Sequence, residues 1–83
     1  MEIIVRKPTE GEICYMQREA IWECGVSEFA WRYERDETCL ILEGRATVTY
    51  DGGSASFGAG DLVFFPKMDC MWKVTAPMKK HYR

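Results

Sequence analysis

The chain has 83 residues, of which 47% are hydrophobic and 13% aromatic, enough for one domain with a dense core and too many for a disordered chain. Its net charge is −2 and its lysines and arginines are scattered, so no basic stripe can neutralise phosphates and we expect no nucleic-acid partner. No apolar run is long enough to span a membrane, so we expect no membrane partner. The length leaves room for a single domain, over residues 1–83.

The first eight residues, MEIIVRKP, carry charges around a short apolar stretch and do not form a signal peptide. We therefore predict a soluble, cytoplasmic protein.

The four cysteines are widely spaced and form no C-x-x-C pair, so in a reducing compartment they are predicted to be free thiols. They are Cys14, Cys24, Cys39 and Cys70. His81 is the only histidine, which excludes a site with several histidine ligands within one chain.

In chain order, residues 3–5 (IIV) predict a first strand, and residues 9–18 are the only helical candidate. Thr9 and Glu12 have the spacing of a capping box, whereas Gly11 in the first turn limits the helix to one or two turns. Residues 28–33 alternate, with Phe29, Trp31 and Tyr33 on one face, and predict a strand.

The remaining segments also read as short strands separated by glycine, proline and aspartate. We expect them at residues 38–42, 45–50, 54–57, 62–65 and 70–74, with a hairpin turn at 51–53. The sequence therefore predicts an all-β barrel or sandwich. Strands 38–42 and 62–65 are apolar on both faces, which fits either a double-layered barrel or an outer face covered by a partner subunit in a homodimer.

Two spacings carry more specific information. Glu37 is followed by six residues and then Gly44, and Gly60 and Pro66 enclose five residues. Residues 27–44 and 60–72 resemble the two motifs of the cupin superfamily. Nearly the whole chain is similar to the small single-domain cupins related to the ureidoglycine aminohydrolase cupin domain. The short segments that carry this wider resemblance are KPT, IWE, VSEF, ETC, GDLV and KHY. The resemblance implies an RmlC-like antiparallel jelly roll, a cupin β-barrel.

Metal-binding cupins hold their ion with two histidines, a glutamate and a third histidine. Here the resemblance places Trp31 and Tyr33 at the first two histidine positions and either Cys70 or Met71 at the third, and Glu37 alone is retained. An indole nitrogen only donates and cannot bind a metal. The resemblance thus implies a barrel without a histidine metal site. We expect no cofactor, and a divalent metal is the alternative.

The candidate ligand-binding residues are predicted to share the barrel interior. They are Trp31, Tyr33, Glu37, Cys39, Cys70 and Trp72. Glu37 is either a general acid or base, or an anchor for a ligand, or a structural remnant of a lost metal site. The aromatic residues either line a pocket or fill the core. Glu37 and Cys70 are the catalytic candidates, and a Cys70–His81 nucleophilic pair requires the fold to bring those two side chains together.

Three functions follow as hypotheses. The first is binding of a small organic molecule in the barrel by these residues. The second, implied by the resemblance, is a hydrolytic reaction on a ureide or amino compound. The third is a non-catalytic module that forms a homodimer. The sequence leaves open whether any reaction is catalysed.

Overall fold

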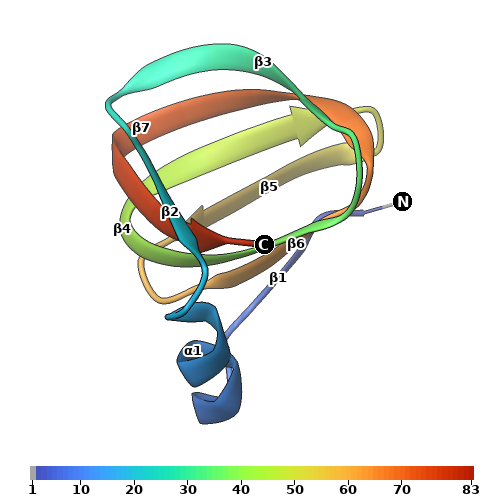
Figure 1. Ribbon diagram of the computed structural model, residues 1–83. Helices are drawn as coiled ribbons and strands as arrows, with labels where there is room; N and C mark the ends of the chain where they lie inside the picture. Colours follow the sequence, from blue (N-terminus) through green and yellow to red (C-terminus); the bar gives the residue numbers. More distant parts are fainter. Residues whose placement is uncertain (1) are drawn as a thin grey trace.

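Two long antiparallel strands organise the computed structural model, which describes residues 2–83 (Figure 1). They are β4, Glu37–Tyr50, and β7, Met68–Tyr82, and they pair along most of their length. Because the pairing is antiparallel, the beginning of β4 lies beside the end of β7. Cys39 is opposite Tyr82 at this end of the ladder.

Each long strand contributes one half to each of two sheet layers. The first half of β4 pairs with β6 (Leu62–Phe65) and its second half with β5 (Gly53–Gly58). The first half of β7 pairs with β3 (Ser27–Tyr33) and its second half with β2 (Ala20–Cys24). β1 (Ile4–Arg6) completes the first layer on β6. The layers run β1-β6-β4-β7-β2 and β5-β4-β7-β3, and together they form the predicted all-β barrel.

The two long strands bend where the register between them shifts, around Gly44. Gly44 has φ +96°, and a Cβ there would lie 2.3 Å from the carbonyl oxygen of Pro77. Only glycine allows this approach of the two backbones. Pro77 falls between the end of the β3 pairing at Val74 and the start of the β2 pairing at Met78, where its missing N–H breaks neither ladder.

The barrel interior is filled by alternating side chains of both layers. This main core consists of Ile3, Tyr33, Cys39, Ile41, Ala46, Val48, Phe57, Val63, Phe65, Cys70, Trp72, Val74 and Met78. β3, β4 and β7 therefore each direct one face inward, as the period of two in their sequences requires.

A second, smaller cluster lies on the outside of β4 and β6, where helix α1 (Glu10–Met16) covers the sheet. Met16 and Ile13 of the helix pack on Leu40 and Leu62. The two strands that are apolar on both faces are thus explained within one chain, because the helix covers their outer face. A homodimer stays a prediction.

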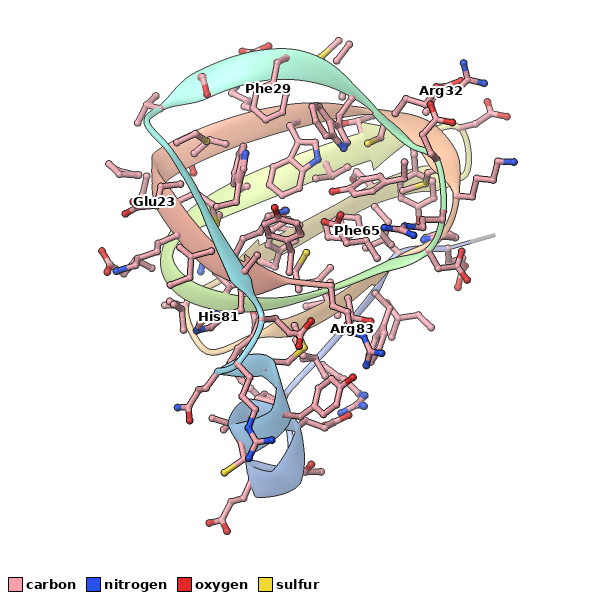
Figure 2. All side chains as sticks on the ribbon, in the orientation of Figure 1. Glu23, Phe29, Arg32, Phe65, His81 and Arg83 are labelled. Carbon is pink, nitrogen blue, oxygen red and sulfur yellow. The ribbon has the colours of Figure 1, made fainter. Side chains whose placement is uncertain are left out.

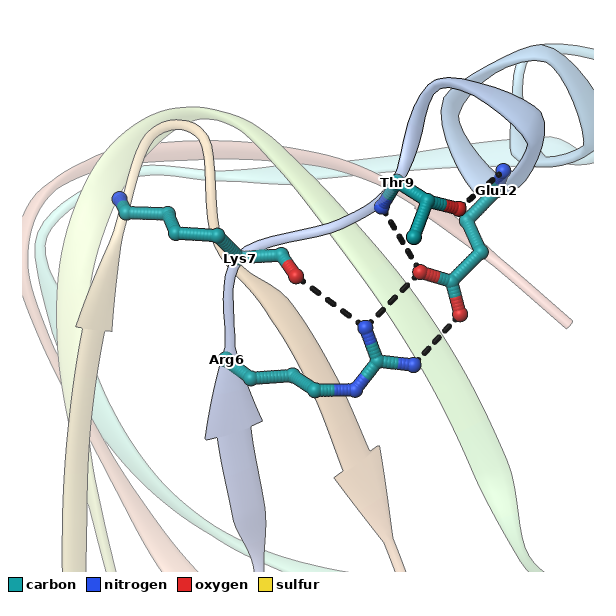
Figure 3. Close-up of polar contacts among 4 residues, drawn as sticks. All are labelled: Arg6, Lys7, Thr9 and Glu12. Carbon is teal, nitrogen blue, oxygen red and sulfur yellow. Dashed lines mark hydrogen bonds and ion pairs between the residues drawn. The ribbon is translucent and has the colours of Figure 1, made fainter.

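The helix begins where the capping box predicts (Figure 3). The hydroxyl of Thr9 accepts from the amide of Glu12 at 3.2 Å, and the carboxylate of Glu12 accepts from the amide of Thr9 at 2.8 Å. Arg6 donates to both carboxylate oxygens of Glu12 and, chiefly through these bonds, lowers the pKa of Glu12 to about 2. These bonds hold the end of β1 against the start of α1.

No helix within residues 2–83 is long and apolar enough to cross a membrane.

One strand was missed, and the bounds of two others were wrong. The missed strand is β2, because AIWEC shows no alternation and forms a short strand with Ile21 half exposed. β4 is one strand that continues through Gly44, and β7 runs beyond Val74 to Tyr82. Gly44 and Pro77 were expected to end these strands, whereas both lie at a bend in the middle of the β4–β7 ladder.

Gly44→Ala tests the bend. We expect a loss of about 3 kcal/mol or more in the free energy of unfolding, because a Cβ at positive φ would press on backbone that cannot retreat. Gly25→Ala is the matched control, since nothing lies within 4 Å of its added Cβ, and it should be neutral or slightly stabilising. Urea denaturation measures both variants. Equal stabilities for the two would contradict the assigned role of Gly44.

Candidate functional site

A pocket of about 150 Å³ lies within the barrel between β2, β3, β4 and β7. Its walls are aromatic and are formed by Trp22, Phe29, Trp31, Tyr33, Trp72 and Tyr82. Glu37 and Lys80 supply its charged groups. A cavity of roughly 150 Å³ holds a molecule of benzene size, so the pocket suits a single small ring.

The aromatic rings pack on one another in a fixed arrangement. Phe29 stacks on Trp72 with ring centroids 6.0 Å apart and an angle of 7°, and Trp22 contacts Trp72 at 6.0 Å. Trp31 meets Phe29 and Tyr33 edge to face and is 50% exposed. Figure 2 shows Phe65 within the barrel, and the centroid of its ring lies 5.6 Å from that of Trp72. Mutual packing holds the walls in place without a ligand.

The centre of the site is an ion pair between β4 and β7. Lys80 Nζ lies 3.5 Å from Glu37 Oε2, and the two side chains are 6% and 22% exposed. The same ammonium lies over the rings of Trp72, Trp22 and Phe65, with centroid distances of 4.7, 4.9 and 5.6 Å. The buried positive charge is therefore stabilised by one carboxylate and three aromatic faces.

Strand register explains why these two residues meet. Glu37 is the first residue of β4 and pairs with Phe65 of β6, while Lys80 pairs with Ile41 of β4. Lys80 also pairs with Trp22 across β2 and β7. The start of β4 and the end of β7 lie at the same end of the long ladder, so one charged residue from each strand reaches the same interior point.

The indole N–H of Trp72 is fully buried, so it is not exposed to the pocket. It has no hydrogen bond of standard geometry among residues 2–83, and its polar neighbour is the hydroxyl of Tyr33.

The two buried thiols are protonated. Cys39 donates to Glu37 Oε2 at 3.2 Å, and burial is the main cause that raises the pKa of Cys39 to about 12. Cys70 donates to the carbonyl oxygen of Trp31 at 3.6 Å, and burial also raises the pKa of its thiol. Neither lines the pocket. Cys70 is on the inner face of β7, whereas Met71 is 47% exposed, so Cys70 is the residue on the inner face opposite Trp31.

The structure does not bring Cys70 and His81 together. Cys70 is near the beginning of β7 and His81 near its end, and His81 Nδ1 lies 3.0 Å from the backbone oxygen of Glu19. The imidazole therefore ties the end of β7 to the segment before β2. A Cys70–His81 nucleophilic pair is not formed.

The donor set does not fit the divalent metal of histidine-containing cupins. Trp31 has no lone pair to offer, and burial raises the pKa of Tyr33 so that it remains a phenol. The buried thiols are protonated, and Glu37 already holds Lys80. Within residues 2–83, no three His, Cys, Asp or Glu side chains are placed to hold a metal ion.

Four of the six predicted site residues, Trp31, Tyr33, Glu37 and Trp72, line the pocket, and Cys39 and Cys70 lie outside its lining. Four pocket residues were missed: Trp22, Phe29, Lys80 and Tyr82. Lys80 has the same parity along β7 as Cys70 and Trp72. Continuing that alternation past Pro77 would have placed Lys80 inside the barrel.

The sequence model described as the EutQ-like cupin domain matches residues 8–82. A DUF861 family protein from Thermotoga maritima is 44% identical, with a TM-score of 0.93 over 99% of this chain and 98% of that chain. The Clostridium difficile EutQ protein is 25% identical, with a TM-score of 0.68 over 75% of this chain and 50% of that chain. A cupin superfamily protein from Desulfitobacterium hafniense, 14% identical, shares the fold with a TM-score of 0.57 over 98% of this chain and 74% of its own. No curated protein matches the sequence significantly.

Glu37→Gln tests the buried ion pair. We expect it to lower the free energy of unfolding by about 2 kcal/mol or more, because Lys80 is left buried without its carboxylate. The double variant Glu37→Gln, Lys80→Met should recover at least half of this loss. The exposed pair Arg32–Asp69 is the control, and Asp69→Asn should cost less than about 0.5 kcal/mol. A double variant that is less stable than Glu37→Gln would refute the pairing.

The pKa of Cys39 predicts its reactivity. In the native protein at about pH 8, iodoacetamide should modify exposed Cys14 and leave Cys39 unmodified, since the thiolate is the reactive form. Raising the pH to about 10 should still spare Cys39, whose pKa is about 12. Peptide mass spectrometry after quenching reads out each site. Modification of both at similar rates would be inconsistent with a buried, protonated Cys39.

Proposed function

The chain belongs to the EutQ-like cupin family, and we propose that its barrel binds a small planar organic molecule. One observation carries this proposal: a pocket of about 150 Å³ combines aromatic walls with a buried ion pair. Pockets of this composition bind ligands by stacking on the walls and fix their orientation through a few polar groups.

The walls favour a flat ligand. Phe29 and Trp72 lie parallel to one another, and Trp22 is tilted against Trp72, so a ring beside them gains stacking or edge contacts. Trp31 is half exposed and forms the part of the wall that meets solvent. The ligand in this proposal is a single ring or a molecule of similar size.

Two other functions raised by the sequence have less support. For a hydrolytic reaction on a ureide or amino compound, the pocket offers one carboxylate, Glu37, and the raised pKa values of Cys39 and Cys70 disfavour a thiolate nucleophile. For a homodimerising module, helix α1 already covers the outer apolar face at Leu40 and Leu62.

Single-ring fragments test the proposal. Benzyl alcohol, benzamide, benzoate and benzylamine are titrated into isotope-labelled protein, and at least one should cause saturable NMR shifts at pocket residues. Phe29→Ala should weaken that binding about fivefold, because it removes one stacking wall. Tyr15→Ala is the control, since Tyr15 is 47% exposed and lies outside this pocket, and it should change nothing. Absence of pocket shifts with all four fragments would refute ligand binding of this kind.

A further inference from the structure

The charges of the pocket restrict the ligand further. Lys80 and Glu37 neutralise each other within the barrel. A ligand with a net charge would therefore leave one buried charge without compensation, which is costly in a site walled by aromatic rings. An uncharged ligand avoids this cost.

The donors of the pocket require an acceptor on the ligand. An ammonium has three N–H bonds, and within residues 2–83 the only hydrogen bond from the side chain of Lys80 is the one to Glu37. The ammonium therefore has N–H bonds left for a ligand, and a carbonyl oxygen is a suitable acceptor.

Glu37 requires a hydrogen-bond donor on the ligand. Its carboxylate accepts from Lys80 and from the thiol of Cys39, both through Oε2, so the second oxygen has capacity for a ligand donor. A donor on the atom next to the ligand's carbonyl would face this carboxylate while the oxygen faces Lys80. The ligand thus presents an acceptor and a donor side by side.

We infer that the pocket selects an uncharged planar compound with an N–H next to its C=O, such as a primary amide on a small ring. Lys80 binds the oxygen, and Glu37 accepts from the N–H. In this arrangement the ammonium is the fixed cation that polarises the carbonyl. The inference rests on the proposed binding function and adds to it the chemical class of the ligand.

Four size-matched probes test this selectivity: benzamide, acetophenone, benzoate and benzylamine. By NMR titration, benzamide should bind at least tenfold more tightly than benzoate and benzylamine. Acetophenone keeps the acceptor and lacks the donor, so its affinity should lie between that of benzamide and those of the two charged probes. If the charged probes bind as tightly as benzamide, the ligand class is wrong although the binding function stands. If none of the four binds, both proposals fail.

Two variants assign the preference to the ion pair. Glu37→Gln, Lys80→Met keeps the pocket uncharged and should bring benzamide and acetophenone within about twofold of each other. Lys79→Met, on the adjacent residue outside the pocket, should change neither affinity. An unchanged benzamide preference in the double variant would overturn the inference.

Discussion

The antiparallel pairing of β4 with β7 is the constraint on which the rest of the structure depends. It spans both sheet layers only because the ladder bends at Gly44 and Pro77, where the two backbones approach too closely for a side chain. The same pairing places the start of β4 beside the end of β7. Glu37 and Lys80, far apart in the sequence, therefore meet inside the barrel, and the site is a direct product of the ladder.

The chemistry of the site follows from that meeting. A buried ammonium needs compensation, which it receives from Glu37 and from the faces of Trp22, Phe65 and Trp72. Glu37 is thereby engaged by an internal cation, and aromatic side chains line the pocket around it. What results is an electrically neutral pocket with polar groups at one point and flat walls around it.

The sequence predicted most of the fold, because alternation and turn residues are local signals. The capping box located α1, and the spacing from Glu37 to Gly44 identified the motif whose glycine the bend requires. Lys80 was missed because Pro77 looked like the end of a strand, although the parity of β7 continues through it. Trp22 was missed because its short strand is recognisable only from its pairing with β7. The pairing of Trp22 is long-range and leaves no local pattern, whereas Lys80 could have been found by continuing the alternation of β7.

A crystal structure of the protein soaked with benzamide, recorded with anomalous data for transition metals, tests the central claim most directly. The ligand's oxygen should lie within about 3 Å of Lys80 Nζ, with its amide N–H facing Glu37. An anomalous peak bound to the Glu37 carboxylate, with Lys80 turned away from it, would contradict the claim that the lysine is the barrel's fixed cation.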